Sequence, residues 1–508
     1  MTIINIFDVN KTVAAGILLL AIVPGIFLVS VIKHYRDPLR SIPGPFWAKF
    51  TRLWYLRQML TGKSRETIVK LHEQYGKLRL SACVGFYQGS VVRIAPDEFS
   101  ISDLDIMREV YGPRTTFEKS EAYAPFTNPG GVTLVSERNN KAHRDLRRKF
   151  HFSFSFSQVI KMESLIDQGL DILSKKFNEL AKDGRDCDLL HWLKFWSMDN
   201  SALLIFGESF GCVESDADNN GLLTLTRAST FYASVVGIIP EWHKALWNLV
   251  PSYILREKEV RSFSEKQIAE KEAAKDTKGT ACFMDTWFRQ KEADRMDNTE
   301  VRIGIGGALG GTELTPSFVA QSIYHVYKKP AVLQRLRDEI DPEMKRSETA
   351  DRGILSHDAV QGMPYLQAVL KEVLRLYPIA AITMPRVVPQ GGANLVGYHF
   401  RAGQVIGANP CAASRKEEYF GHDAGDFRPE RWLDDPEEAK KVNYYSLPFS
   451  MGGRECIGKH VATLMVLKVL ALIFHSYDIE TPDKDLELWN DIVVQVKSLT
   501  GRVRPRQS

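Results

Sequence analysis

Apolar side chains recur every three or four residues through much of this chain, which is the spacing of helices that bury one face. Segments with the pattern of strands are few and short. The sequence therefore predicts a mainly helical protein with small β-sheets. The clearest predicted helices are Ser164–Leu180, Val332–Ile340, Leu366–Leu376 and Val461–Phe474, and the clearest strand segments lie in Gly89–Ala95 and Gly397–Ala408.

Two polar segments, Gly211–Gly221 and Glu270–Thr280, interrupt the helical pattern and are predicted to be surface loops. Between them lies Phe231–Ile254, which is rich in aromatic and aliphatic side chains. Its composition leaves two interpretations open. The segment is either part of the core or a surface that faces lipid or admits a substrate.

The N-terminal segment Thr12–Ile32 carries no charged side chain and is about long enough to cross a bilayer core of roughly 30 Å. No small-residue cleavage site follows it, which disfavours a signal peptide. Basic residues crowd its C-terminal flank, and this bias places the rest of the chain in the cytosol. Those basic residues are Lys33, Arg36 and Arg40.

The prolines on either side of Gly44 cannot continue a helix and form a stiff joint. We therefore predict two parts of the chain. Residues 1–40 form a membrane anchor and hinge, with a transmembrane helix at about residues 12–32, and residues 41–508 form one catalytic domain.

The charge balance changes this picture little. The chain holds 66 Lys and Arg against 62 Asp and Glu, a formal net charge of +4, which is too small to indicate a nucleic-acid partner. Its six cysteines are scattered without a C-x-x-C pair. They indicate neither a disulfide framework nor a zinc site, and they suit a reducing compartment.

The segment "FSMGGRECIGKH", residues 449–460, has two interpretations. Read from Gly453, it differs from a phosphate-binding P-loop only at its last position, where His460 replaces the hydroxyl that would hold Mg²⁺. Pro448 also interrupts the strand that should precede such a loop. A P-loop nucleotide binder is therefore the weaker interpretation.

The other interpretation centres on Cys456. Gly452, Gly453 and Gly458 let the backbone bend closely around it, so that amide N–H groups can point at the sulfur. An amphipathic helix is predicted over Ile457–His475, and its positive N-terminal end favours a thiolate. A single thiolate with no second cysteine beside it suits one axial bond to an iron whose other ligands come from a macrocycle.

The pattern F-x-x-G-x-R-x-C-x-G is matched at Phe449, Gly452, Arg454, Cys456 and Gly458. In this loop the chain resembles the cytochrome P-450 superfamily of haem-thiolate monooxygenases, and it looks most like the fungal pisatin demethylase-like members. Further matches follow the order of that family. They are "HRDLRRKF" with His143 and Arg147, "EVLR" with Glu372 and Arg375, "MPRVVP" with Arg386, and "FRPERW" with Arg431.

The resemblance implies the cytochrome P-450 fold and a haem b cofactor. Cys456 would be the iron ligand, and Phe449 would pack against its loop. The haem propionates would be held by His143, Arg147, Arg386 and Arg454, because carboxylates beside a haem need charged donors. Glu372, Arg375 and Arg431 would form a buried ion network.

The same resemblance implies an enzyme that inserts one oxygen atom of O₂ into a small apolar organic substrate. Its electrons would come from an NADPH-cytochrome reductase, and its membrane would be that of the endoplasmic reticulum, crossed once. The family's reductase docks near the cysteine loop, where this chain has basic residues. They are Lys141, Arg144, Arg148, Lys149 and Lys459.

The helix on the oxygen side departs from the family pattern. In "GGTELT" (Gly310–Thr315), Glu313 supplies the expected acid, but Leu314 stands where a proton-relaying threonine is expected. A leucine cannot donate a hydrogen bond. Thr315 is rotated by roughly 100° around a regular helix, so it could substitute only if the helix is distorted. The departure keeps a haem-thiolate isomerase, dehydratase or peroxide-using enzyme as alternatives.

Overall fold

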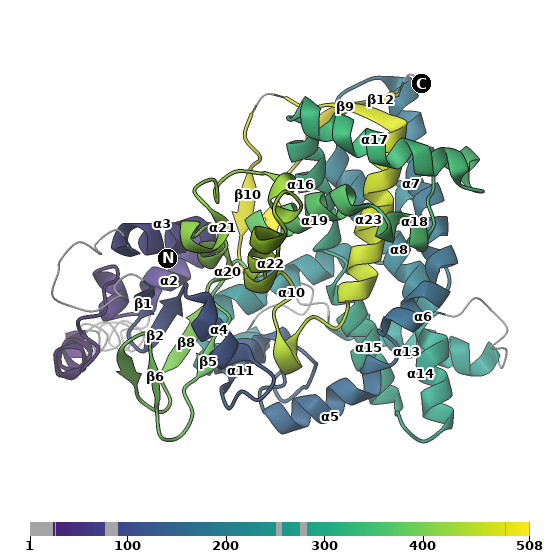
Figure 1. The fold of residues 1–508 in the computed structure, drawn as a ribbon. Coiled ribbons are helices and arrows are strands. Elements are labelled where there is room, and N and C mark those ends of the chain that lie inside the picture. The colour runs from purple at the N-terminus through teal and green to yellow at the C-terminus, as the bar shows by residue number, and fades with distance from the viewer. Residues whose placement is uncertain are drawn as a thin grey trace, which may run out of the picture.

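The computed structural model describes residues 24–25, 27–76, 90–249, 257–274, 282–482 and 484–506. Within these ranges the chain is mainly helical with small sheets, as predicted. Most of the long helices gather on the right of Figure 1, whereas α2, α3 and α4 lie on its left with most strands of the main sheet. Most of the predicted transmembrane helix lies outside the described residues, whereas residues 27–36 are helical.

All four of the clearest predicted helices are present with longer bounds. They are α7 (Glu163–Asp183), α17 (Pro330–Arg346), α19 (Pro364–Leu376) and α23 (Lys459–Ser476). The other long helices are α2 (Leu53–Leu60), α3 (Ser64–Gly76), α4 (Leu104–Tyr111), α5 (Asn140–His151), α8 (Leu189–Phe206), α10 (Leu222–Val236), α13 (Glu257–Ala274), α14 (Phe283–Glu292), α15 (Asn298–Gly310), α16 (Thr315–Tyr327) and α22 (Pro436–Tyr445).

Short helices and 3₁₀ turns connect these elements. They include α6 (Phe156–Lys161), α9 (Cys212–Ser215), α11 (His243–Leu249), α18 (His357–Gln361), α20 (Pro410–Ala413) and α21 (Glu417–Phe420), and the 3₁₀ turns η1 (Trp47–Lys49), η3 (Glu121–Phe126), η4 (Pro240–Trp242), η6 (Pro429–Trp432) and η7 (Gly452–Arg454).

The main sheet has five strands in the order β1-β2-β8-β5-β3, with β2 and β8 parallel and the other pairs antiparallel. Its strands are β1 (Val91–Ala95), β2 (Glu98–Ile101), β3 (Glu118–Lys119), β5 (Arg386–Val387) and β8 (Val405–Ala408). The smaller sheets pair β6 (Ala393–Leu395) with β7 (Tyr398–Phe400), β10 (Leu488–Asn490) with β11 (Val494–Val496), and β12 (Thr500–Pro505) with β4 (Cys187–Asp188) and β9 (Tyr477–Glu480). Both predicted strand segments therefore form strands.

Helix α23 is not the amphipathic helix that was predicted. Every residue from Leu464 to Phe474 is buried, including Lys468, because α16, α17 and α19 pack around the helix (Figure 1). The Lys468 ammonium is paired with Glu163 and Asp167 of α7, each 2.5 Å away. Among the described helices α23 is long and apolar enough to cross a membrane, but its burial makes it a core helix.

The predicted surface loops and the aromatic segment are corrected in part. Residues 211–221 contain the short helix α9, and residues 270–274 belong to α13, while 275–280 lie outside the described residues. In the aromatic segment Tyr232 and Val236 are buried, whereas Trp242 and Leu249 are 58% and 76% exposed. The first part of the segment therefore belongs to the core and Trp242 and Leu249 lie at the surface, while residues 250–254 lie outside the described residues.

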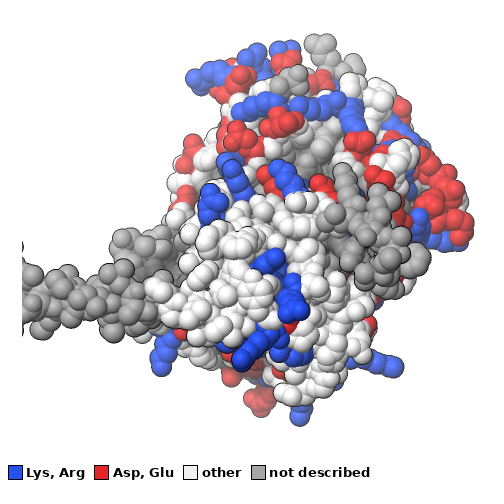
Figure 2. All heavy atoms as spheres, turned by 90° about the vertical axis from the view of Figure 1, so that its left-hand side faces the viewer, with Lys and Arg blue, Asp and Glu red and all other residues white. Residues whose placement is uncertain are grey.

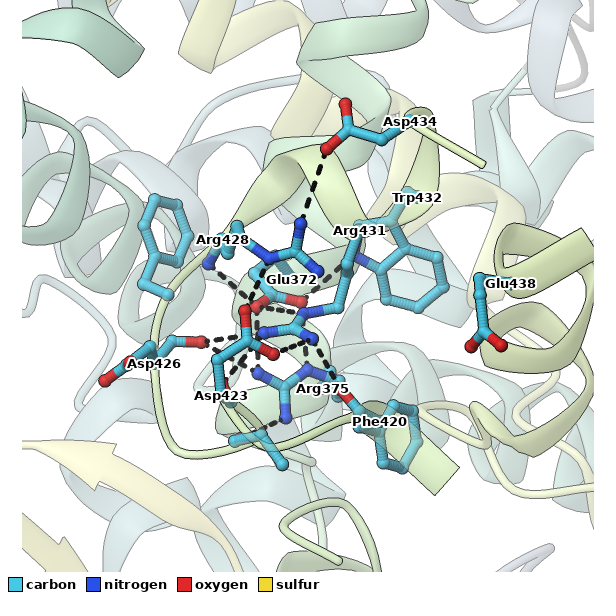
Figure 3. Close-up of polar contacts among 12 residues, drawn as sticks. Glu372, Arg375, Phe420, Asp423, Asp426, Arg428, Arg431, Trp432, Asp434 and Glu438 are labelled. Atoms are coloured by element: carbon cyan, nitrogen blue, oxygen red, sulfur yellow. Dashed lines mark hydrogen bonds and ion pairs between the residues drawn. The ribbon is translucent and has the colours of Figure 1, made fainter. Parts of the chain in front are cut away.

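The predicted ion network is present and buried (Figure 3). The Glu372 carboxylate accepts hydrogen bonds from Arg375 at 2.8 and 2.9 Å and from Arg431 at 2.9 Å, and all three side chains are at most 2% exposed. Trp432 Nε1 donates to the same carboxylate at 3.0 Å. The network joins α19 to the segment around η6.

Candidate active site

The loop between α22 and α23 turns sharply before Cys456. The Cys456 N–H donates to the carbonyl of Phe449 at 2.9 Å, and both Ser450 and Gly452 adopt positive φ, at 62° and 65°. A Cβ at Gly452 would lie 2.4 Å from the carbonyl oxygen of Tyr111 at the end of α4. Glycine is therefore required at this position both by backbone conformation and by space.

The nucleotide interpretation is not supported by this geometry. Residues 446–451 contain no strand, and the loop follows helix α22 rather than the end of a sheet. A P-loop needs a strand before its glycines and a hydroxyl after its lysine. His460 lies inside α23 instead.

The Cys456 side chain is partly buried, and burial raises the pKa of its thiol. The Gly458 N–H hydrogen bond and the charge of Arg147 act in the opposite direction, and Lys459 adds to them. A bound metal ion would deprotonate the thiol outright. Across the described residues no three His, Cys, Asp or Glu side chains gather as a metal site, so a metal at Cys456 would take its other ligands from a cofactor.

The four predicted propionate partners form one basic cluster. His143 and Arg147 lie on α5, Arg386 begins β5, and Arg454 ends η7. Burial lowers the pKa of His143 to about 3, and the charge of Arg454 is the next cause. Burial and the charge of Arg386 lower the pKa of Arg454 to about 10. These side chains therefore repel one another in a partly buried place.

Lys119 of β3 completes this cluster, and sequence reasoning missed it. In the antiparallel register of β3 and β5, Lys119 is the direct partner of Arg386. Burial and the charge of Arg386 hold the pKa of Lys119 well below its ordinary value. Like charges directly opposite on neighbouring strands are destabilising. No local motif marks Lys119, because only the strand pairing brings it here.

The hydrogen bonds of the cluster go mainly to neutral oxygens. Arg147 donates to the carbonyl of Glu455, Arg454 to the carbonyls of Glu137 and Arg138, Arg386 to Tyr123 Oη and the carbonyl of Pro385, and Lys119 to the carbonyl of Val135. The nearby carboxylates of Glu137 and Glu455 offset only part of the positive charge. The arrangement suits a ligand that carries more than one negative charge.

The oxygen-side helix is distorted at the GGTELT segment, which is the condition under which Thr315 could replace the missing threonine. Helix α15 ends at Gly310 and α16 begins at Thr315, with turns of the i→i+3 type between them. Ser197 of α8 donates to the carbonyl of Thr312 at 2.8 Å, and Thr312 donates to the Ser201 hydroxyl at 3.0 Å. Side chains of α8 thus satisfy polar groups of the broken helix.

One face of α15 borders open space. A Cβ added at Gly306, Gly307 or Gly310 would meet no atom within 4 Å, whereas one at Gly304 would clash with Phe150 and Trp287. The packed face of the helix therefore belongs to the core. The glycine face leaves room for a flat or bulky ligand beside the break.

Glu313 and Thr315, the acid and the hydroxyl of the GGTELT segment, lie at this break. Glu313 is 5% exposed and accepts a hydrogen bond from Thr230 of α10 at 3.3 Å. Burial raises the pKa of Glu313, and the charge of Arg227 opposes this rise. Thr315 is also 5% exposed at the start of α16, and Leu314 packs partly against the main core.

Comparison with known proteins decides the family. The family model described as cytochrome P-450 matches residues 42–499. This chain belongs to the cytochrome P-450 family. Curated relatives cover most of its length. Pisatin demethylase of Fusarium vanettenii is 28% identical over 493 residues, covering 94% of this chain and 91% of the relative.

Two further relatives of this P-450 are named as monooxygenases. The cytochrome P-450 monooxygenase gsfF of Penicillium aethiopicum is 28% identical, covering 90% of this chain and 92% of the relative. A cytochrome P-450 monooxygenase of Aspergillus flavus is 29% identical, covering 88% and 89%. The predicted resemblance to fungal pisatin demethylase-like members is confirmed.

Members of the family are haem-thiolate enzymes, so haem b is the cofactor of this P-450. The residues present fit that group. A haem carries two propionate carboxylates. Arg147, Arg386 and Arg454 offer them positive charge that nearby carboxylates offset only in part, and His143 and Lys119 add hydrogen-bond donors. The glycine face of α15 provides room, and Cys456 offers a thiol without protein co-ligands among the described residues.

Proposed function

We propose that this P-450 is a membrane-anchored monooxygenase of fungal secondary metabolism. It inserts one oxygen atom from O₂ into a small apolar organic substrate. The observation that carries the proposal is the Cys456 loop set beside a basic cluster without a full counter-charge. Relatives named as monooxygenases support the reaction class, and the name of pisatin demethylase says that this relative demethylates pisatin.

In this proposal Cys456 is the iron ligand, and Phe449 holds its loop through the hydrogen bond to the Cys456 N–H. The propionates are bound by His143, Arg147, Arg386 and Arg454, together with Lys119. When bound, the haem supplies the redox chemistry that activates O₂.

The remaining steps belong to side chains at the break between α15 and α16. Glu313 holds a proton at a higher pH than an ordinary carboxyl, because it is buried. Thr315 offers a hydroxyl one position after Leu314, where the helix no longer keeps a regular 100° step. Glu313 and Thr315 therefore deliver protons toward the open glycine face.

The electron donor is proposed to be an NADPH-cytochrome reductase that docks on α5. Arg144 and Arg148 are exposed on this helix, and Arg148 is 75% exposed. Arg147 of the same helix reaches the cysteine loop. Positive charge here would steer a partner with an acidic surface.

Association with the endoplasmic reticulum membrane is supported by exposed apolar side chains on several elements. They are Phe46, Trp47, Leu53, Leu60, Trp242 and Leu249. Arg52 lies 3.1 Å from Glu241, which joins the start of α2 to η4. The face in Figure 2, on the side of α2 in Figure 1, shows a broad uncharged area with a few basic side chains. Such a surface suits contact with lipid beside a single-pass anchor.

The test starts with the reduced holoprotein and carbon monoxide. A thiolate-type red-shifted Soret band is expected, lost in Cys456→Ala and kept in Cys411→Ala, whose cysteine is buried elsewhere. Supplied with O₂, NADPH and reductase, the holoprotein should then add one oxygen atom of O₂ to an apolar compound in a substrate library, while the other atom leaves as water. A protein that stays colourless after haem supplementation contradicts the proposal. Full product formation without NADPH and reductase would instead favour an isomerase, dehydratase or peroxide-using enzyme.

A further inference from the structure

Three elements that are distant in sequence meet at Arg227. This arginine lies on α10, Glu313 lies in the break before α16, and Asp491 lies in the turn between β10 and β11. Arg227 Nη1 is 2.9 Å from Asp491 Oδ2 and 3.7 Å from Glu313 Oε1. The two carboxylates are 0% and 6% exposed. One arginine thus stands between two buried acids.

The hydrogen bonds of Arg227 favour the side of the β10–β11 turn. Its guanidinium donates to Asp491 and to the amide oxygen of Gln495, while its distance to Glu313 is too long for a hydrogen bond. Asp491 is held in place by a second bond, since its Oδ1 accepts from the Val493 N–H at 3.1 Å. Arg227 is therefore hydrogen-bonded to Asp491 and not to Glu313.

Two buried carboxylates that share one cation cannot both ionise cheaply. The acid that receives the hydrogen bonds of the arginine is the one stabilised as an anion. The other acid keeps only a weakened counter-charge and retains its proton more readily. In this P-450 the hydrogen bonds of Arg227 go to Asp491, and Glu313 is left with the weaker counter-charge.

We propose that Asp491 is a positioning residue for proton delivery, because it holds Arg227 away from Glu313 and so keeps Glu313 able to carry a proton. The inference rests on the proposed role of Glu313 and extends it to the C-terminal hairpin. Asp491 acts only through Arg227 and needs no contact with substrate or cofactor.

The charged groups that face Glu313 come from three elements. Arg227 on α10 lowers the pKa of Glu313 and Asp491 raises it, after the larger effect of burial. The charge of Glu313 also acts on Lys194 of α8, where it opposes the lowering of the lysine pKa by burial. Removing the negative charge of Asp491 would release Arg227 toward Glu313, and both changes lower the pKa of Glu313. Removing Arg227 as well would take away the cation that Glu313 had gained.

The test is infrared difference spectroscopy of the ferric holoprotein across a pH series. The C=O stretch of a protonated buried carboxyl is assigned to Glu313 by its absence in Glu313→Gln. In Asp491→Asn this band should disappear at a lower pH than in the wild type. In the double variant Arg227→Gln with Asp491→Asn, the pH of disappearance should rise again above that of the single variant.

Asp358→Asn is the control, because this aspartate is 99% exposed, and it should leave the band unchanged. If the Arg227 contacts only held the three elements together, the band of the double variant should be shifted at least as far from the wild type as that of the single variant. The inference is overturned if Asp491→Asn leaves the pH at which the band disappears unchanged or raises it. It is also overturned if the band of the double variant disappears at the same pH as that of the single variant. The band is read without turnover, so it tests Asp491 independently of the product assay.

Discussion

Arg147 of α5 donates a hydrogen bond of 2.6 Å to the main-chain carbonyl of Glu455, the residue before Cys456. The contact joins a helix in the first third of the sequence to a loop more than 300 positions later. Because Arg147 also belongs to the basic cluster, one side chain holds the cysteine loop and, in the proposed function, also supplies charge for a propionate. Loss of this side chain should therefore weaken cofactor retention more than fold stability.

Replacing Arg147 with alanine should speed haem release. A hydrogen bond to a charged group contributes about 1.5–3 kcal/mol, so release should be roughly tenfold faster or more. The measurement is haem transfer from the ferric protein to an excess of an apo-globin. Arg148→Ala is the matched control, since Arg148 lies on the same helix, is 75% exposed and pairs only at the surface with Asp145. Equal release from both variants would contradict the role of Arg147.

Replacing Glu372 with glutamine should destabilise the protein by about 3–5 kcal/mol, because Arg375 would stay buried without its counter-charge and Arg431 would keep only Asp423. Thermal unfolding of the holoprotein measures the loss. Glu437→Gln on α22 is the control, as its side chain is 80% exposed and its pair with Lys440 is worth little. An unfolding temperature equal to that of the wild type would show that the network is dispensable.

The same variant should remove one source of acid sensitivity. Burial alone would raise the pKa of Glu372, but Arg375 and Arg431 hold it below the ordinary value of 4.5. A carboxyl with a depressed pKa stabilises the fold above its unfolded-state pKa, and this stabilisation is lost as the pH falls through the folded-state pKa. The difference in unfolding temperature between wild type and Glu372→Gln should thus stay constant near neutrality and shrink below about pH 4.5. A difference that grows on acidification would reverse the assigned sign.

The stability of a truncated protein should depend on the position at which the anchor is removed. Arg93 is 1% exposed and lies 2.6 Å from Asp37, while Leu39 is buried beside it. A protein that begins after Arg36 keeps this ion pair, whereas one that begins after Arg40 leaves Arg93 buried and unpaired.

The longer truncation should therefore unfold more easily by about 3–5 kcal/mol, and Asp37→Ala in the shorter truncation should reproduce the loss. Both truncated proteins should pellet with membranes less than the intact chain. Full membrane association of both would refute the single-anchor prediction.

Reversing charge on α5 should slow reduction by the reductase. Arg144 and Arg148 are exposed, so changing both to glutamate should reduce the rate at low salt and have less effect at high salt, where charges are screened. Stopped-flow reduction of the ferric protein under carbon monoxide gives the rate. Lys345→Glu on α17, at the opposite end of the molecule in Figure 1, is the control. A salt-independent effect, or an equal effect of the control, would place the docking surface elsewhere.

Local patterns in the sequence were enough to predict four of the long helices and the cysteine loop. The apolar spacing of α7 and α19 reports a buried face directly, since one side of a helix repeats every 3.6 residues. The motif around Cys456 identified the family because its glycines and arginine stand at fixed offsets. The E-x-x-R pair could be predicted to be buried only because "PERW" follows downstream, as a lone pair of that kind is usually exposed.

Other features could not be predicted locally, because they depend on what packs around a segment. Helix α23 was predicted as amphipathic, yet the pairing of Lys468 with two acids of α7 allows burial on every side. Lys119 joins the basic cluster only through the register of β3 against β5.

The sequence by itself determined the family and the helical class, and it singled out Cys456 as the proposed iron ligand, because each depends on residue types at short, fixed spacing. Only the tertiary structure decided how charge is distributed around the site. In the folded chain Lys119 lies opposite Arg386, and Arg227 pairs closely with Asp491 rather than with Glu313. Electrostatic interactions depend on distance and burial in space, and neither can be read from separation along the chain.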